Sequence, residues 1–246
     1  MPAPVWLTQI AVAHRGLHHL EKTGIPENSI AAFAAAIDKG YAIELDVRLS
    51  RDGIAMVFHD AKLDRLTGRE GLADQLTATE LGALPLLGTS ERPPTFRQVL
   101  DFVAGRAPLV IEIKNYGDAP VGPLEQAVAR DLAEYAGPFA LQSFSPGVVD
   151  WLRRNLPDAV RGQIATLPEE MKSLDDAQKA ALKQALDAGF GDPHFIAFDV
   201  THLPQPLTER ARARGLPVLT WTVRSPEVWA RAKAHADNPI FEFWLP

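Results

Sequence analysis

The sequence predicts an α/β protein built as a TIM-type (β/α)₈ barrel that is distorted and carries a small insertion after its third strand. Apolar runs alternate with helical patterns along all 246 residues, of which 46% are hydrophobic. No internal repeat or low-complexity linker interrupts this alternation, so we expect residues 1–246 to form a single barrel domain. No Gly-x-Gly-x-x-Gly motif follows a strand, which argues against an open nucleotide-binding sheet.

Several apolar runs have the length and composition that are typical of buried strands. They lie at residues 9–13, 41–48, 54–58, 109–113, 139–142, 159–164, 195–200, 217–223 and 240–243. Residues 60–93 contain no clean strand and are rich in Gly, Thr, Leu and Pro. We therefore expect residues 60–93 to form the small insertion, over the mouth of the barrel.

The helices between these strands are predicted from their ends. Asn28 is a candidate N-cap, and Thr95 with Gln98 matches a capping box. Ser145 and Ser225 are each followed by proline, the pattern of an N-cap with proline at the first helical position. Further helices are expected at about 123–136, 173–188 and 208–214.

Two acids lie within the second predicted strand, residues 41–48. Glu44 and Asp46 alternate with apolar residues. Side chains repeat every two residues along a strand, so the two carboxylates share one face.

A hairpin is predicted directly after this strand. The Asp-Gly pair at 52–53 lies between two apolar-rich runs, a strong signal for a two-residue turn. If Arg51 faces Ile54 across that turn, His59 lies opposite Asp46 and shares its face, whereas a register shifted by one residue would put His59 on the other face. Two acids and an imidazole on one patch indicate a divalent-metal site with an acid/base group beside it.

Polar side chains also gather at the predicted carboxyl ends of four strands, where barrels of this type carry their reacting groups. These segments are His14-Arg15-Gly16, Glu44 with Asp46, His59-Asp60, and Glu112 with Lys114. Each pair taken alone also fits an ordinary ion-pair network. Three acids inside a barrel would leave uncompensated buried charge, and a bound cation removes that cost.

The composition narrows the partners and the metal. A net charge of −6 gives no reason to expect a nucleic acid partner. The absence of cysteine leaves oxygen and imidazole as the metal ligands. No apolar run reaches the roughly 18 residues of a membrane span, and no secretory cleavage pattern is present. We expect a cytoplasmic protein without stable membrane insertion.

Eight short motifs occur in one order over nearly the whole chain. They are His14-Arg15-Gly16, Pro26-Glu27-Asn28-Ser29, Glu44-Leu45-Asp46-Val47, Asp52-Gly53, His59-Asp60 with Leu63, Arg65 and Thr67, Glu112-Ile113-Lys114, Gln142-Ser143-Phe144, and Trp221-Thr222-Val223. Together they resemble the glycerophosphodiester phosphodiesterase family. The chain departs from the family at Ser29, where Thr is usual, and at its C-terminus, which lacks the usual Thr-Asp-x-Pro ending.

The resemblance implies a barrel with an inserted segment after the His-Asp motif, in agreement with residues 60–93. It implies hydrolysis of small-molecule glycerophosphodiesters to sn-glycerol 3-phosphate and an alcohol. It also implies one divalent cation held by Glu44, Asp46 and Glu112. Oxygen ligands favour Mg²⁺ or Ca²⁺.

The residues beside the acids fit cleavage of a phosphodiester. Arg15 can fork two hydrogen bonds onto phosphate oxygens, and Lys114 supplies a compact positive charge. His14 and His59 suit a paired base and acid, because imidazole titrates near neutral pH. The attacking oxygen belongs either to water or to the glycerol hydroxyl of the substrate.

Four further residues have predicted roles near the site. Phe144 and Trp221 form either an apolar wall for the substrate or part of the core. Glu27 and Asn28 are expected to brace the site.

Two other functions stay open from the sequence. A metal-dependent sugar isomerase or aldolase barrel also gathers Glu, Asp and His at strand ends. A barrel that binds a phosphorylated ligand without catalysis needs no acid/base pair, so the presence of both His14 and His59 argues against it.

Overall fold

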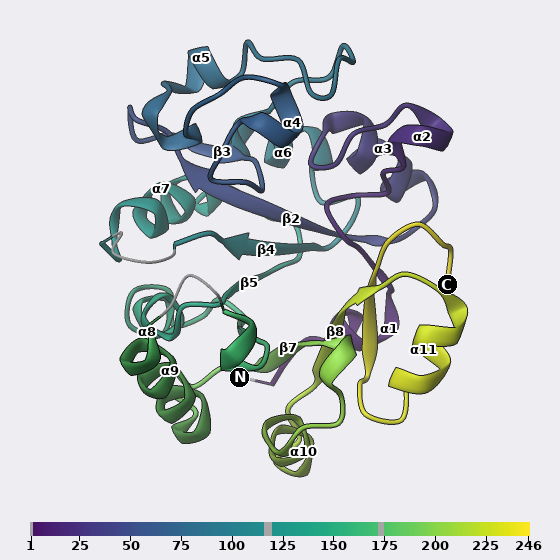
Figure 1. Cartoon of the computed structure of the whole chain (residues 1–246), viewed down its shortest axis with the longest axis vertical. Helices are drawn as coiled ribbons and strands as arrows, with labels where there is room; N and C mark the ends of the chain where they lie inside the picture. Colours follow the sequence, from purple (N-terminus) through teal and green to yellow (C-terminus); the bar gives the residue numbers. More distant parts are fainter. Residues whose placement is uncertain (1, 116–119, 172–174) are drawn as a thin grey trace. The chain divides into compact units, whose positions relative to one another are not determined.

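The computed structural model describes residues 2–115, 120–171 and 175–246. Over these residues nine strands follow the order β1-β9-β8-β7-β6-β5-β4-β2-β3, and β1 also pairs with β2, so eight strands close into a ring. Figure 1 labels most of the helices and strands. The strands are β1 Val12–Ala13, β2 Ala42–Leu49, β3 Ala55–Val57, β4 Leu109–Ile113, β5 Phe139–Ser143, β6 Arg161–Ala165, β7 Phe195–Asp199, β8 Val218–Val223 and β9 Asn238–Phe241. β3 pairs antiparallel with β2, outside the ring. The predicted (β/α)₈ barrel is confirmed.

Helices separate most of the strands, as the sequence predicts. They are α1 Trp6–Gln9, α2 Leu20–Thr23, α3 Ile30–Asp38, α4 Asp64–Thr67, α5 Ala78–Leu81, α6 Phe96–Val103, α7 Pro123–Leu132, α8 Pro146–Asn155, α9 Asp176–Ala188, α10 Pro206–Ala213 and α11 Pro226–Ala232, with short 3₁₀ turns η1 Ala73–Gln75, η2 Pro168–Glu170 and η3 Val200–His202. The predicted start of α9 at residues 173 and 174 lies outside the described residues. No helix in the described part of the chain is both long and apolar enough to cross a lipid bilayer.

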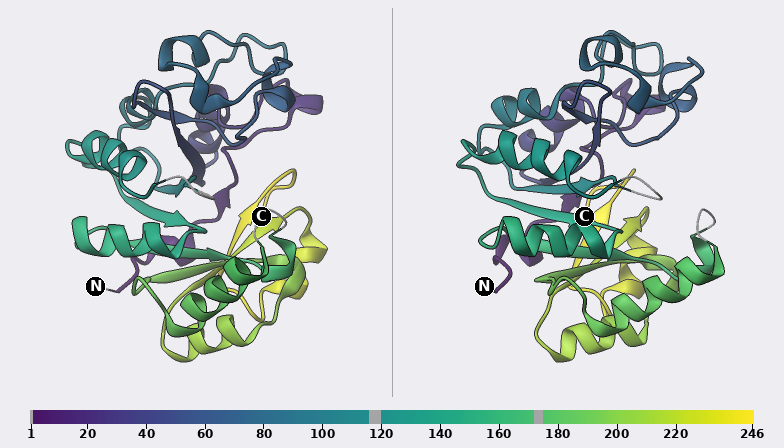
Figure 2. Two further views of the ribbon diagram at one scale, coloured as in Figure 1. Left: turned by 60° about the vertical axis from the view of Figure 1, so that its left-hand side comes forward. Right: turned by 90° about the vertical axis from the view of Figure 1, so that its left-hand side faces the viewer.

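The chain forms two compact units. The first comprises Met1–Val12, Asn115–Val121 and Ala140–Pro246, and the second comprises Ala13–Lys114 and Gly122–Phe139. In the first unit α8 packs on β6, α10 on β7 and β8, and α11 on β8 (Figure 2). In the second unit α3 and α7 pack on β2, and α6 packs on β3. That residues 1–246 form a single domain stays a prediction.

The parallel register of β2 and β4 sets the place of the acids. Asp46 is paired with Glu112 across the two strands. Glu44 precedes Asp46 by two residues, so all three side chains leave the sheet on one face. The backbone N–H of Lys114 donates to the carbonyl of Val47 at 3.0 Å, which continues this register past the end of β4.

The hairpin after β2 is one residue longer than predicted. Ser50, not Arg51, faces Ile54, because the backbone N–H of Ser50 donates to the carbonyl of Ile54 at 2.9 Å. The loop therefore has three residues, 51–53. Gly53 adopts φ 78°, the left-handed conformation that a three-residue hairpin loop requires. The predicted two-residue turn is wrong.

This register changes how His59 reaches the acids. The backbone N–H of Phe58 donates to the carbonyl of Asp46 at 3.0 Å, so His59 is not opposite Asp46. β3 ends at Val57, and His59 lies in the irregular segment that follows. There the Nε of Arg48 donates to the carbonyl of His59 at 2.7 Å. A positive charge on His59 still acts on the Asp46 carboxylate, so His59 is near Asp46 without being its strand partner.

Most helix ends agree with their predicted caps, with one correction. The capping box of Thr95 and Gln98 starts α6, and Ser145 and Ser225 cap α8 and α11. The N-cap of α3, however, is Ser29, whose hydroxyl accepts from the N–H of Ala32 at 3.1 Å. Asn28 is not a cap because its side chain is turned toward β2.

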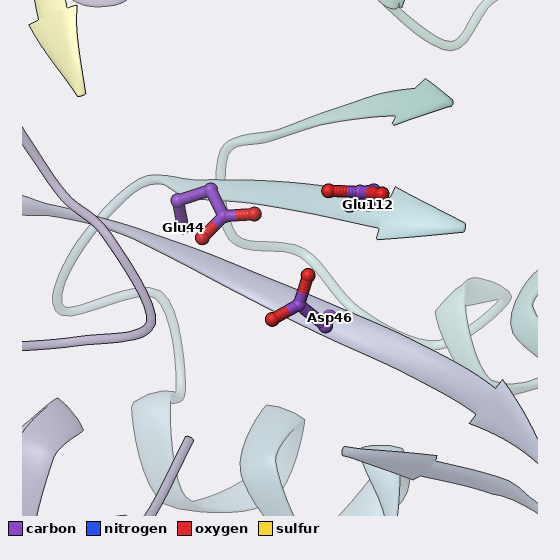
Figure 3. A group of neighbouring side chains, drawn as sticks. All are labelled: Glu44, Asp46 and Glu112. Atoms are coloured by element: carbon purple, nitrogen blue, oxygen red, sulfur yellow. The ribbon is translucent and has the colours of Figure 1, made fainter. Parts of the chain in front are cut away.

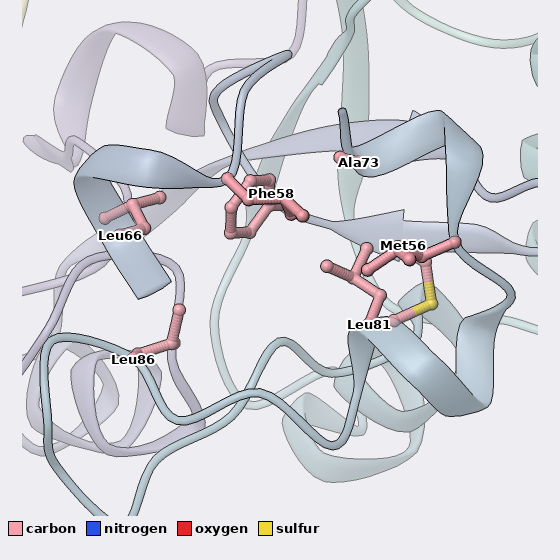
Figure 4. Packing of buried hydrophobic residues seen from close by; sticks show 8 residues of the cluster. Met56, Phe58, Leu66, Ala73, Leu81 and Leu86 are labelled. Carbon is pink, nitrogen blue, oxygen red and sulfur yellow. The ribbon is translucent and has the colours of Figure 1, made fainter. Parts of the chain in front are cut away.

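The segment at 60–93 folds around apolar side chains of its own. It contains α4, η1 and α5 and, among its described residues, no named strand. Its buried side chains pack with two residues of the β3 region (Figure 4). The cluster comprises Met56, Phe58, Leu63, Leu66, Ala73, Leu76, Leu81 and Leu86. That this segment covers the barrel mouth stays a prediction.

Candidate active site

Three carboxylates from two strands converge in the second unit. Glu44 and Asp46 project from β2 and Glu112 projects from β4, with their carboxyl groups directed toward one another (Figure 3). One oxygen of each lies within 4.8 Å of the others. All three residues are buried, at 1%, 0% and 6% exposure. Among the described residues, this is the group whose spacing suits a metal ion.

Two basic side chains lie against these acids. The Nζ of Lys114 is 2.9 Å from Oδ1 of Asp46 and 2.8 Å from Oε1 of Glu112. The Nε of Arg15 is 3.6 Å from Oδ2 of Asp46. Burial would lower the pKa of Lys114, but the two carboxylates outweigh burial and raise it, so the ammonium group stays charged.

Hydrogen bonds from the segment between β1 and α3 orient two of the carboxylates. The backbone N–H of Arg15 donates to Oε2 of Glu44 at 3.0 Å. The amide of Asn28 donates to Oδ2 of Asp46 at 2.8 Å, and its oxygen accepts from the backbone N–H of Asp46 at 3.3 Å. The bracing role predicted for Asn28 therefore consists of direct contact with an acid.

The loop that carries Arg15 depends on a glycine. Arg15 and Gly16 adopt φ 57° and φ 78°, and the N–H of Gly16 donates to the carbonyls of Ala13 and Glu44, each at 3.2 Å. A Cβ atom on Gly16 would lie 2.8 Å from the Cβ of Ala32, closer than packed carbon atoms allow. The His-Arg-Gly sequence is thus explained by a left-handed turn pressed against α3.

The charges of the cluster fit a divalent cation. Burial, together with the neighbouring Asp46 and Glu112, raises the pKa of Glu44 well above its usual range. Burial also favours the neutral form of Asp46, but the charge of Lys114 and other nearby cationic groups outweighs it and lowers that pKa well below its usual range. Lys114 and Arg15 set two positive charges against three carboxyl groups, and Arg15 is shared with Glu27. An oxygen-only donor set of this kind suits a hard cation such as Mg²⁺ or Ca²⁺.

The two predicted acid/base histidines lie in the same unit as the acids. The Nε2 of His14 is 3.9 Å from Oε2 of Glu44, and His14 is 8% exposed. The Nδ1 of His59 lies 2.6 Å from Oδ1 of Asp60. Burial would raise the pKa of Asp60, but hydrogen bonds from His59 and Arg65 hold it well below its usual range. The ionised Asp60 therefore accepts a hydrogen bond from Nδ1–H of His59, which leaves Nε2 as the nitrogen that carries no proton in the neutral ring.

Phe144 and Trp221 belong to the first unit. Their rings form an edge-to-face pair with centroids 5.4 Å apart at 82°, and the Nε1 of Trp221 donates to the carbonyl of Ala197 at 3.2 Å. These contacts give both rings a packing role. A contact of either ring with the substrate stays a prediction.

The structure adds a charged network that sequence patterns did not predict. Arg65 donates two hydrogen bonds to Glu27 and two to Asp60. Glu27 also accepts from Arg15 at 2.6 Å. A single Arg on a four-residue helix gives no periodic signal. In the sequence, Arg65 is indicated only by its place in the motif that begins with His59-Asp60.

The comparisons with known proteins agree with this geometry. Residues 14–241 match the glycerophosphoryl diester phosphodiesterase family. The chain is 36% identical over 134 residues to a glycerophosphodiester phosphodiesterase of Caldanaerobacter subterraneus, over 51% of this chain and 53% of that one. This alignment thus spans about half of the relative's length. The chain is 27% identical over 242 residues to YhdW of Bacillus subtilis, a proposed glycerophosphodiester phosphodiesterase, over 93% of this chain and 92% of that one.

A solved structure supports the fold. A phosphodiesterase of Oleispira antarctica, in complex with its product sn-glycerol-3-phosphate, matches with a TM-score of 0.77 and 21% identity, over 95% of this chain and 92% of that chain. At this identity the likeness bears on the barrel alone, whereas the family match extends over nearly the whole sequence. The chain therefore belongs to the glycerophosphoryl diester phosphodiesterase family of enzymes.

Proposed function

We propose that this protein hydrolyses glycerophosphodiesters to sn-glycerol 3-phosphate and the free alcohol. The main support is the buried group of Glu44, Asp46 and Glu112 with Lys114 and Arg15 against it. Family membership over residues 14–241 supports the same activity. The relative from Oleispira antarctica binds the product that this reaction would release.

One divalent cation, Mg²⁺ or Ca²⁺, would be held by the three carboxylates. When bound, such an ion neutralises charge on phosphoryl oxygens as the diester is attacked. The surrounding hydrogen bonds support this assignment, because Arg15 and Asn28 already fix the orientation of Glu44 and Asp46. Fixed ligands reduce the reorganisation that binding an ion would require.

Arg15 and Lys114 would bind the phosphate of the substrate. Lys114 is buried and Arg15 is largely shielded beside the acids, where water screens their charges little. Arg15 presents a planar fork that matches two phosphate oxygens, and Lys114 adds a compact charge. Together they favour the negative charge of a phosphodiester in the site.

His14 and His59 would transfer the protons. One imidazole accepts the proton of the attacking hydroxyl as the new P–O bond forms. The other imidazole gives a proton to the leaving alcohol oxygen as the old P–O bond breaks. The hydrogen bond from His59 Nδ1 to Asp60 supports this role, because it leaves Nε2 for the exchange. The attacking hydroxyl belongs to water or to the glycerol part of the substrate; in the second case a cyclic phosphate forms first, and water then opens it to glycerol 3-phosphate.

The activity can be tested directly. Purified protein is incubated with glycerophosphocholine, glycerophosphoethanolamine and other glycerophosphodiesters, with Mg²⁺ or Ca²⁺ or with a chelator. We expect release of glycerol 3-phosphate that depends on the added ion and stops in chelator. If no diester in the panel releases glycerol 3-phosphate with either ion, the proposal is wrong and a binding function takes its place.

The predicted cytoplasmic location stays a prediction.

A further inference from the structure

We infer that Arg65 is a positioning residue for the reaction proposed above. Its guanidinium holds two carboxylates, those of Asp60 and Glu27. Asp60 in turn holds the imidazole of His59, and Glu27 in turn holds the guanidinium of Arg15. The inference rests on the proposed function, which gives His59 and Arg15 their tasks.

The guanidinium of Arg65 donates hydrogen bonds from two of its edges. Its Nε and Nη2 donate to Oδ2 and Oδ1 of Asp60 at 2.7 and 2.8 Å. Its Nη1 and Nη2 donate to Oε2 and Oε1 of Glu27 at 2.7 and 2.8 Å. These two bidentate contacts fix the plane of each carboxylate and its distance from the guanidinium. A lysine ammonium has one centre of charge and cannot reproduce this geometry.

Each carboxylate also contacts a group that is assigned to the reaction. Oδ1 of Asp60 lies 2.6 Å from Nδ1 of His59. Oε1 of Glu27 lies 2.6 Å from Nη1 of Arg15. The Arg65 side chain is 48% exposed, whereas those of Asp60 and Glu27 are 20% and 8% exposed. Arg65 therefore acts from the rim of the network on carboxylates that are more buried than itself.

The charge balance shows why this arginine is needed. Without Arg65, the Glu27 carboxylate would have Arg15 as its remaining partner among the contacts described here. Arg15 is also 3.6 Å from Asp46, and a stronger pull from Glu27 would draw it away from the place proposed for the phosphate. Asp60 would lose the two hydrogen bonds that set its plane, and the ring of His59 would lose a fixed orientation.

The insertion holds Arg65 in place. Arg65 lies on α4, between Leu63 and Leu66, which are 1% and 0% exposed and belong to the apolar cluster of residues 60–93. Figure 4 shows Leu66 packed in this cluster beside Phe58. Phe58 immediately precedes His59, so one packed cluster carries both the arginine and the segment that presents the histidine. The inserted segment thus has a task in the proposed reaction.

Kinetics of matched variants test the inference. We expect Arg65→Gln to lower kcat/KM by roughly 10- to 100-fold, in line with small misplacements of reacting groups. Arg65→Lys should recover little of this loss. Arg51→Gln is the control, because Arg51 is an arginine of the same unit whose partner Glu80 is itself half-exposed. In the Asp60→Asn/Glu27→Gln background, Arg65→Gln should cost less than about twofold, since the two carboxylates through which it acts are already lost.

A second measurement needs no substrate. Nitrogen NMR of labelled imidazoles reports whether Nδ1 of His59 carries the proton. We expect Nδ1–H in the unaltered protein and a mixture of tautomers in Arg65→Gln. If Arg65→Gln fails to fold, kcat/KM and the His59 tautomer are measured on Arg65→Lys instead.

Three results would overturn the inference. They are full kcat/KM in Arg65→Gln, a fully additive loss in the double-variant background, and an unchanged His59 tautomer. If the unaltered protein releases no glycerol 3-phosphate, the proposed function fails, whereas the tautomer of His59 still tests the positioning by Arg65.

Discussion

Asn28 shows how a residue can serve a site while occupying a conformation that most side chains avoid. Its backbone adopts φ 53°, and its amide makes two hydrogen bonds with Asp46. Asparagine tolerates this left-handed region better than most residues. Ser29 takes the capping role that the sequence assigned to Asn28. One position therefore starts the helix and its neighbour orients an acid.

At the same scale, we expect replacement of either histidine to remove acid/base catalysis. His14→Ala or His59→Ala should lower kcat by roughly 10² to 10⁴-fold, the usual range for loss of such a group. The thermal midpoint should change little. Steady-state assays and thermal denaturation of each variant check this. Loss of folding in parallel with loss of rate would show instead that the histidines are structural.

The acids make a separate prediction. Glu44→Gln removes one ionisable carboxyl group from the cluster that also contains Asp46 and Glu112, and it keeps nearly the same shape. We expect the concentration of Mg²⁺ or Ca²⁺ needed for half-maximal activity to rise. Titration of activity with each ion measures it, and Glu80→Gln, at a half-exposed position, is the comparison, since its half-maximal ion concentration should be unchanged. An unaltered ion requirement in Glu44→Gln would remove this residue from the ligand set.

At the scale of elements, local patterns predicted most strands and helices but not their exact pairing. The capping box at Thr95 and the proline-containing starts of α8 and α11 are local signals, and all were confirmed. The register of the β2–β3 hairpin was wrong by one residue because Asp-Gly fits both a two-residue and a three-residue loop. The pairing is chosen by contacts outside the turn, such as the hydrogen bond from the Arg51 N–H to the Leu76 carbonyl at 2.8 Å.

The apolar cluster of residues 60–93 predicts a measurable cost for a single truncation. Leu66 is fully buried in that cluster. We expect Leu66→Ala to lower the free energy of unfolding by about 2–5 kcal/mol, as buried leucine truncations do. Denaturant unfolding followed by fluorescence checks this. Leu72→Ala is the matched control, because Leu72 is 37% exposed and should lose far less. Similar losses in both variants would contradict the packing described here.

At the scale of the whole molecule, the alternation of strands and helices was enough to predict a barrel. It was not enough to predict which distant charges would meet. Arg65 and Glu27 are 38 residues apart, and neither lies in a periodic pattern. The convergence of Glu112 with Asp46 was predictable from strand patterns. Asp46 lies two residues after Glu44, and Glu112 lies two residues before Lys114. The fold places these two strands side by side.

The charged network also predicts how stability depends on pH. Burial would raise the pKa of Glu27, but hydrogen bonds and charges of Arg65 and Arg15 outweigh it and lower this pKa; the pKa of Asp60 is lowered as well. Both groups have a higher pKa when unfolded, about 4. The stability that they contribute is therefore present above about pH 4 and is lost as the pH falls toward the folded values.

Thermal denaturation of metal-free protein tests this dependence. We expect Asp60→Asn to lower the midpoint most at pH 7, less at pH 3 and least at pH 2. Asp158→Asn, at an exposed position, is the control and should change the midpoint little at any of these pH values. A difference between Asp60→Asn and the unaltered protein that stays constant from pH 7 to pH 2 would show that Asp60 does not titrate as described.

Strand β2 limits how this sequence can change in evolution. Its neighbouring side chains point to opposite faces, with acids on one and aliphatic groups such as Ile43 and Leu45 on the other, and all of these are buried. Gain or loss of a single codon between Ala42 and Asp46 would exchange the two faces and set an aliphatic chain among the carboxylates. Length variation in descendants of this gene should therefore accumulate in the loop at 51–53 and in the outer loops of 60–93, while the count of residues in β2 stays constant.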